Sequence, residues 1–152
     1  QLLDLLDALV SDFQTHEEEI YRKLVGIMKE RLDFYCARLA QEPWNDASKE
    51  AASAYMRGLT KELEALVRVL AATLPTSALQ PILTKIAQTG AKRLVEHYSQ
   101  LPLTTSVSQH RIHQDITFFT NALSTFEGMV VTQEDVAVLN NFCSNLSSFR
   151  EK

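Results

Sequence analysis

The chain has 152 residues, of which 45% are hydrophobic and 22% are charged, as is typical of a folded globular domain. Four glycines and four prolines are too few for the many turns of an all-β protein, and no apolar run approaches the roughly 20 residues that span a bilayer. The formal net charge is −4 and the basic residues are scattered, so we expect no binding to nucleic acid. These features predict one helical domain over residues 1–152, without a transmembrane segment.

The first predicted helix covers residues 2–39, and its first 19 residues hold six acids and no base. A bend is expected near His16 and Glu17, where the apolar spacing lapses, or at Gly26, which costs about 1 kcal/mol relative to Ala. The helical pattern is already under way at Gln1, so we expect a C-terminal fragment of a longer chain. Its apolar residues recur mostly at helical steps of three and four: Leu2, Leu6, Leu9, Phe13, Ile20, Leu24 and Ile27, then Phe34 and Leu39 after a drift in phase.

A second helix is predicted over residues 47–74. Pro43 ends the first helix, and Asp46 is suited to cap the second because a short acidic side chain accepts hydrogen bonds from free backbone N–H groups. Pro75 stops this helix, because a proline in a helix interior removes a hydrogen bond and clashes with the preceding turn.

The third predicted helix begins at Thr76 or Ser77 and ends before Pro102, and residues 103–109 form a polar linker. The fourth helix has the cleanest spacing, with steps of four, three, four and three residues: Ile112, Ile116, Phe119, Leu123 and Phe126. A capping sequence from Thr132 to Asp135 then precedes a fifth apolar stripe that ends at Phe149.

Five amphipathic helices joined by short links favour antiparallel neighbours. The sequence therefore predicts an elongated antiparallel bundle, in which the first two helices are the longest and project beyond the others. The residues expected in its core are Ile20, Leu24, Ile27, Leu63, Leu70, Ile116, Phe119 and Leu123.

No catalytic or cofactor-binding motif is evident, so we expect neither an enzyme nor a cofactor. The serines lack a G-x-S-x-G elbow, and the glycines are too isolated for a phosphate-binding loop. Cys36 and Cys143 do not form the dense framework of a small secreted domain, which favours reduced thiols in a cytosolic protein.

One alternative from the residues alone is a metal-binding helical bundle. His110 and His113 are three residues apart and therefore share a helix face. A third ligand would have to come from another part of the chain, because structural and catalytic metal sites use at least three protein ligands. Polar histidines near a helix start are more often solvated or capping groups, so this interpretation is the weaker one.

Three patches resemble, in order, the C-terminal part of the vacuolar protein sorting fifty-four family, a subunit of the Golgi-associated retrograde protein (GARP) complex. They are Glu19 to Met28, with the sequence EIYRKLVGIM, then Leu70 to Pro75, and Asp115 to Leu123, with the sequence DITFFTNAL. The similarity spans roughly residues 19–123. The final helix departs more from the family pattern.

This resemblance implies a non-catalytic module of a vesicle-tethering subunit, acting in retrograde transport from endosomes to the trans-Golgi network. It implies a cytosolic protein peripherally associated with those membranes. Its implied partners are other tethering subunits, mainly through upstream sequence, and endosomal or SNARE-type membrane proteins. The off-stripe residues Tyr21, Arg22 and Met28 are the expected contacts. A structural spacer that terminates a helical rod remains an alternative.

Overall fold

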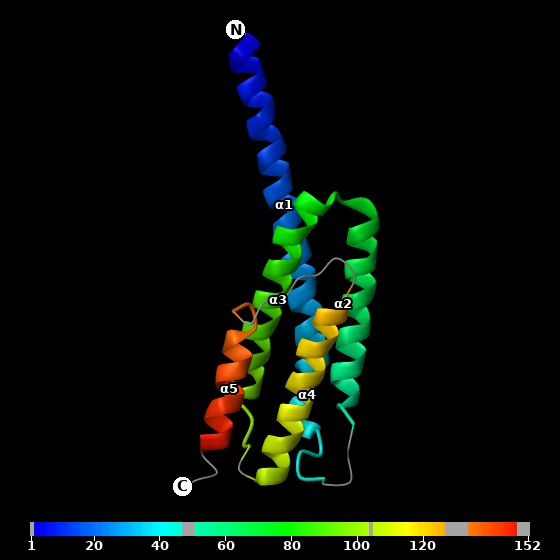
Figure 1. The fold of residues 1–152 in the computed structure, drawn as a ribbon, viewed down its shortest axis with the longest axis vertical. Coiled ribbons are helices and arrows are strands. Elements are labelled where there is room, and N and C mark those ends of the chain that lie inside the picture. Colours follow the sequence, from blue (N-terminus) through cyan, green and yellow to red (C-terminus); the bar gives the residue numbers. More distant parts are fainter. Residues whose placement is uncertain (1, 47–50, 104, 127–133, 149–152) are drawn as a thin grey trace.

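The computed structural model describes residues 2–46, 51–103, 105–126 and 134–148 (Figure 1). Within these ranges the chain forms only helices, which confirms the expected all-α class. The helices are α1 (Leu2–Cys36), α2 (Ala54–Thr73), α3 (Thr76–Tyr98), α4 (Ser106–Thr125) and α5 (Ala137–Ser148), with a short 3₁₀ helix, η1 (Leu39–Gln41), after α1.

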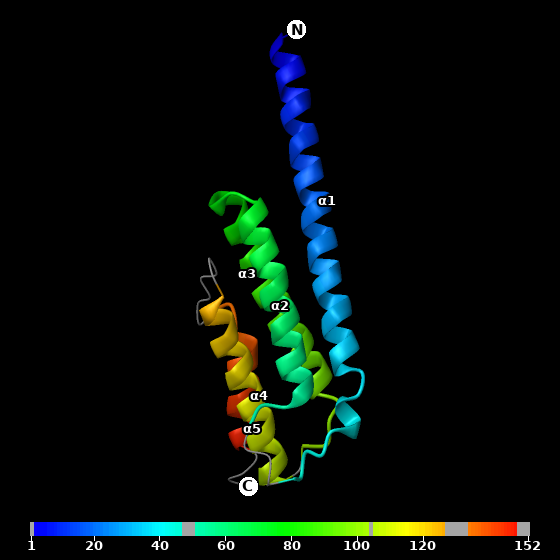
Figure 2. The same cartoon turned by 90° about the vertical axis from the view of Figure 1, so that its right-hand side faces the viewer.

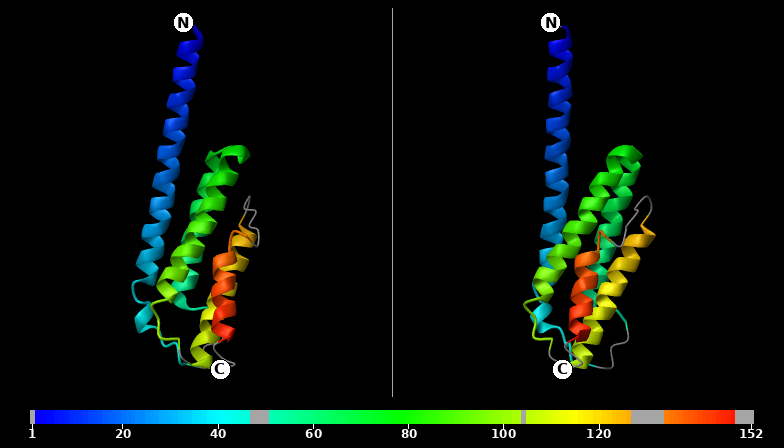
Figure 3. Two further views of the ribbon diagram at one scale, coloured as in Figure 1. Left: turned by 90° about the vertical axis from the view of Figure 1, so that its left-hand side faces the viewer. Right: turned by 60° about the vertical axis from the view of Figure 1, so that its left-hand side comes forward.

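Consecutive helices run antiparallel, so that α1, α3 and α5 descend in Figure 1 while α2 and α4 ascend. The most extensive packing is between α1 and α3, and α3 also packs against α2 and α5. Figure 3 shows from two further sides that α5 lies against α3 and α4. The helix α3 is therefore the central element of an elongated bundle.

The helix α1 has 35 residues, and its N-terminal half extends alone beyond the other helices (Figure 2). It continues through His16 and Gly26 without a sharp bend, so the expected bend is wrong, because intact backbone hydrogen bonds suffice to carry the helix across both positions. The expected lengths are also partly wrong, because α3 has 23 residues and α2 has 20.

Two helix starts differ from the sequence prediction. The second helix begins at Ala54, well after the expected cap at Asp46, and the fourth begins at Ser106, inside the expected linker. Thr105 caps α4, since its hydroxyl accepts a hydrogen bond from the Ser108 backbone N–H at 3.1 Å. The Ser108 hydroxyl in turn accepts one from the Thr105 backbone N–H, which completes a capping box. Residues 47–50 and the expected cap Thr132 lie outside the described residues.

The core runs between all five helices, and the predicted residues Leu63, Leu70, Ile116, Phe119 and Leu123 are buried in it. Leu24 is half-buried against this core.

The core prediction is wrong at Ile20 and Ile27, which are 52% and 48% exposed. Met28 and Leu32 are fully buried instead, because α1 carries two apolar stripes and turns the second of them toward the bundle. Among the helices that the structure describes, none combines the length and the apolar character needed to cross a membrane.

Candidate functional site

A buried polar network joins α2, α3 and α4 at the lower end of the bundle. The carboxylate of Asp115 accepts hydrogen bonds from the Ser53 backbone N–H, at 2.8 Å, and from the Tyr55 hydroxyl, at 2.7 Å. Because Tyr55 donates to Asp115, the Tyr98 hydroxyl donates to Tyr55, at 2.9 Å. Burial raises the pKa of Asp115, although the hydrogen bonds that it accepts oppose this shift.

Arg111 extends the same network to the segment before α2. Its guanidinium donates to the Ser53 hydroxyl at 3.0 Å and to the Pro43 carbonyl, and lies 5.3 Å from the centre of the Trp44 ring. The indole N–H of Trp44 donates to the Leu39 carbonyl at 2.8 Å. These contacts explain why α2 starts late, because tertiary hydrogen bonds hold Ser53, directly before Ala54, in a non-helical position. The network lies in the interior of the bundle, because Ser53, Arg111 and Asp115 are buried.

A second polar cluster joins the C-terminal end of α1 to α3. The guanidinium of Arg93 donates two hydrogen bonds to Asp33, at 2.8 and 2.9 Å, and one to Glu96, at 2.9 Å. His97 Nε2 lies 2.8 Å from the same Asp33 carboxylate. The hydrogen bond from Arg93, followed by that from His97, lowers the pKa of Asp33 to about 2. This arrangement fixes Arg93 and its charge at the edge of a groove.

That groove lies between α1 and α3 and has a volume of about 360 Å³. Its charged lining is mostly basic: Lys29 comes from α1, and Lys85, Lys92 and Arg93 come from α3. Among the described residues, none forms an ion pair with the three lysines. We call this surface, made by Lys29, Lys85, Lys92 and Arg93, the basic groove. It is suited to contact an acidic group of a partner.

The predicted contact residues have different positions relative to the basic groove. Arg22 is exposed and lies seven residues before Lys29, on the same side of α1. Tyr21 is half-buried against the core, and partial burial raises its pKa. Met28 is fully buried, so its prediction as a partner contact is wrong. Its thioether fills the core close to Gly90, at a position that the sequence pattern alone assigned to the outer side of the helix.

The lysines of the basic groove were not singled out from the sequence. Lys85 and Lys92 are seven residues apart and so share a face of α3, which was a usable signal. The proximity of Lys29 to these two lysines could not be predicted from the sequence, because only the packing of α1 on α3 brings it to the same groove.

The two histidines proposed as metal ligands are exposed on α4, and within the described ranges no three His, Cys, Asp or Glu side chains are grouped as a metal site would require. Cys36 and Cys143 are present as thiols rather than as a disulfide. Burial raises the pKa of Cys36 to about 12 and that of Cys143 to about 11, so both thiols are protonated near neutral pH.

No protein-family profile matches the chain. In sequence it is similar to vacuolar protein sorting-associated protein 54, chloroplastic, of Arabidopsis thaliana, with 26% identity over 136 residues. That match covers 86% of this chain but only 13% of the relative, so the chain spans a small part of that protein's length.

Two solved structures resemble the fold over almost its whole length. The Vps54 C-terminal domain gives a TM-score of 0.71 at 19% identity, covering 91% of this chain and 96% of that one. The C-terminal domain of the Vps54 subunit of the GARP complex gives a TM-score of 0.61 at 18% identity, covering 92% and 98%. The resemblance indicated by the three sequence patches is thereby confirmed, and the chain has the fold of the Vps54 C-terminal domain.

Proposed function

We propose that this chain, with the fold of the Vps54 C-terminal domain, is a non-catalytic module of a vesicle-tethering complex subunit. The observation that carries the proposal is the likeness to that domain over 91% of the chain, together with the sequence match to a Vps54 protein. The module acts in retrograde transport from endosomes to the trans-Golgi network, as a cytosolic part peripherally bound to those membranes. Other tethering subunits assemble with the longer protein.

The module docks to a protein on the endosomal membrane, and the basic groove supports this role. Its three lysines are exposed, without ion pairs among the described residues, and are held on two packed helices. Rigid elements position charged groups with little loss of conformational freedom on binding. Complementary charge also speeds the encounter and fixes its orientation. The docking partner therefore presents an acidic segment to the groove.

Charge reversal in the basic groove tests this proposal. The double variant Lys85→Glu/Lys92→Glu should lower recovery of endosomal membranes in a pull-down by about tenfold or more, because two attractive contacts become repulsive. The matched control is Arg57→Glu/Lys61→Glu, which changes the same charge on the exposed side of α2. Equal recovery by both folded double variants would reject the groove as the docking surface.

Arg22→Glu extends the same test along α1. Arg22 is exposed on the side of Lys29, so its reversal should give a smaller loss in the same direction. A change at Tyr21 is less informative, because this side chain also packs against the core.

A structural spacer is the second candidate, favoured by the elongated shape and the projecting end of α1. A spacer acts through its length alone, so an unrelated helical bundle of similar length would replace it without loss of membrane targeting in the full-length protein. A docking module would lose targeting in that exchange.

A further inference from the structure

Besides the apolar stripe that packs on the bundle, the helix α1 carries another that no other described helix covers. Multiples of seven residues separate four of its members, Leu6, Ile20, Ile27 and Phe34. Leu2 and Leu9 are also seven residues apart, and they lie four residues before and three residues after Leu6, on the same face of the helix. All six side chains are exposed, from 48% for Leu6 and Ile27 to 70% for Leu2. Apolar residues at heptad spacing form the contact seam of a two-helix coiled coil. We call these six residues the seam.

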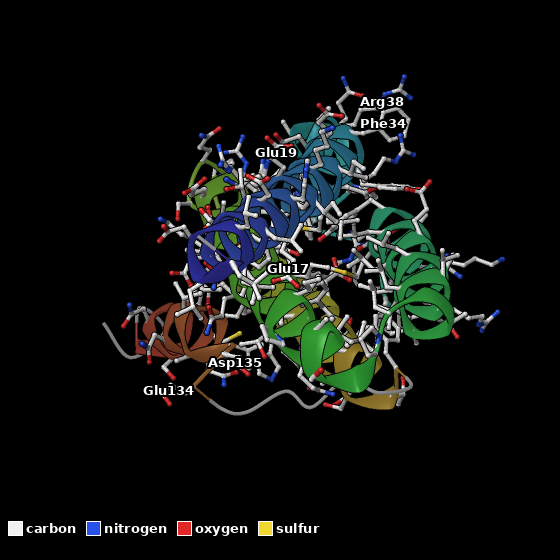
Figure 4. All side chains as sticks on the ribbon, turned by 90° about the horizontal axis from the view of Figure 1, so that it is seen from above. Glu17, Glu19, Phe34, Arg38, Glu134 and Asp135 are labelled. Atoms are coloured by element: carbon white, nitrogen blue, oxygen red, sulfur yellow. The ribbon has the colours of Figure 1, made fainter. Side chains whose placement is uncertain are left out.

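The seam is distinct from the stripe that packs on the bundle. Met28, Leu32 and Cys36 face the core and are buried, whereas Ile27 and Phe34 lie roughly a third to a half of a turn around the helix from them. Figure 4 shows Phe34 together with Arg38 on the side of α1 that faces away from the other helices. A bundle helix with only a structural task needs one apolar stripe, and α1 has two.

An apolar groove continues the seam onto α2. It has a volume of about 260 Å³ and lies between the two helices, with Ile27 at its edge. The α2 side is formed by Leu59, Leu63, Ala65 and Leu66, together with Glu62. Val69 lies one turn beyond Ala65 on α2 and is 61% exposed. A helix laid along the lower part of the seam would therefore contact both α1 and α2.

The charges beside the upper seam are acidic. Asp12, Glu17 and Glu19 lie next to seam positions, and neither Lys nor Arg occurs in the first 19 residues. Figure 4 shows Glu17 and Glu19 on opposite sides of α1, so carboxylates border the seam on both flanks. In coiled coils the flanking charges select the partner and its orientation. This border favours a partner helix with basic flanks.

A second copy of the chain does not supply those flanks. In a parallel pair, the heptad register sets Asp12 of one copy beside Glu17 of the other, which places like charges together. In an antiparallel pair, the acidic half would face the lower half of the partner α1. There the charges are mixed rather than basic on both flanks: Arg31 is already bound to Glu62, with nitrogen to oxygen distances of 2.6 and 2.7 Å, and the exposed Arg38 shares the segment with Glu30 and Asp33.

We propose that the seam binds one amphipathic helix of a different protein, and that this helix has apolar heptad positions and Lys or Arg on both flanks. The apolar side of the partner helix covers Ile20 and Ile27, and its Lys or Arg side chains form ion pairs with Glu17 and Glu19. This interface lies on a different side of α1 from the basic groove and does not depend on the proposed docking function.

Two designed peptides of five heptads test the proposal. Both carry Ile and Leu at the seam positions, and they differ only in having Lys or Glu at all flanking positions. Fluorescence anisotropy with the 152-residue chain should show the Lys peptide binding at least about tenfold more tightly than the Glu peptide. Equal affinity for the two peptides, or no binding of the Lys peptide, overturns the proposal.

The variant Ile27→Glu separates seam contact from general charge attraction. Its added carboxylate would by itself attract the Lys peptide, so a loss of affinity of about tenfold reports the lost apolar contact. Val138→Glu adds the same charge on α5 and should leave the affinity unchanged. Circular dichroism confirms that both variants are folded. Loss of affinity in both variants alike, or a dimer of the unmodified chain by light scattering that Ile27→Glu dissociates, overturns the proposal.

Discussion

At the residue scale, the fold gives individual charged residues partners that cannot be predicted from the sequence. Asp33 binds Arg93 and His97 across the interface of α1 and α3, although 60 and 64 residues separate them in the chain. In the sequence, Asp115 belongs to a family-like patch and lies close to the two histidines considered as metal ligands. Its position beneath the segment before α2 follows from packing, because its partners Ser53 and Tyr55 come from a distant part of the chain.

Asp33 gives a pH dependence with a definite sign. Its pKa is about 2 in the folded chain against an ordinary value of 3.8, so the unfolded chain takes up a proton first as the pH falls. Its contribution to the free energy of unfolding is therefore complete above about pH 4 and is lost between about pH 4 and pH 2. Asp33→Asn should flatten this part of the stability profile, measured by urea unfolding.

The matched control for Asp33 is Asp7→Asn, which removes one exposed carboxylate from the projecting end of α1. This variant should keep the acid-dependent loss of the unmodified chain. If Asp33→Asn and Asp7→Asn gave the same profile, the contact of Asp33 with Arg93 would not be the source of the effect.

At the element scale, close approach of helices decides the effect of a substitution more than helix propensity does. A Cβ atom at Gly58 on α2 would lie 2.6 Å from Cε1 of Tyr35 on α1, whereas a Cβ at Gly26 would meet no atom within 4 Å. Both glycines lie inside helices, where Ala is favoured by about 1 kcal/mol. The two positions therefore separate propensity from packing.

Gly58→Ala should lower the free energy of unfolding by about 1–3 kcal/mol, because the Tyr35 ring must move. The destabilisation from overpacking exceeds the stabilisation from the higher helix propensity of Ala. Gly26→Ala should raise it by about 0.5–1 kcal/mol. Chemical denaturation of both variants measures the difference. A stabilised Gly58→Ala variant would show that the two helices have room to separate.

At the scale of the whole molecule, the network around Asp115 ties Ser53 and the first turn of α2 to α3 and α4. Asp115→Ala leaves the Ser53 N–H and the Tyr55 hydroxyl without their acceptor in the interior. The expected loss is about 2–5 kcal/mol, because each unsatisfied buried donor costs about 1–3 kcal/mol. Denaturation should remain a single transition, as expected for one cooperative core.

A variant on α4 that spares the network is the control for this loss. Asn121→Ala lies on an exposed part of the same helix and should leave the stability within about 0.5 kcal/mol of the original. If Asp115→Ala were as stable as Asn121→Ala, Ser53 and Tyr55 would have to form hydrogen bonds with other acceptors.

Local patterns in the sequence were sufficient for the all-α class, five helices and most of the core. The regular spacing of Ile116, Phe119 and Leu123 predicts a buried face, and all three residues are buried, because periodicity reports which side of a helix leaves water. The helix ends were less predictable. Tertiary hydrogen bonds to Asp115 and Arg111 delay α2, and such bonds have no local signal.

The sequence by itself determined that these residues form amphipathic helices, since apolar spacing, prolines and caps act within a few residues. Only the tertiary structure decided which of the two apolar stripes of α1 is buried and which is left exposed as the seam. It alone brought Lys29 to Lys85 and Lys92 in one groove. The physical reason is that both surfaces depend on how one helix rotates against another, and that rotation is set by the packing of the whole core.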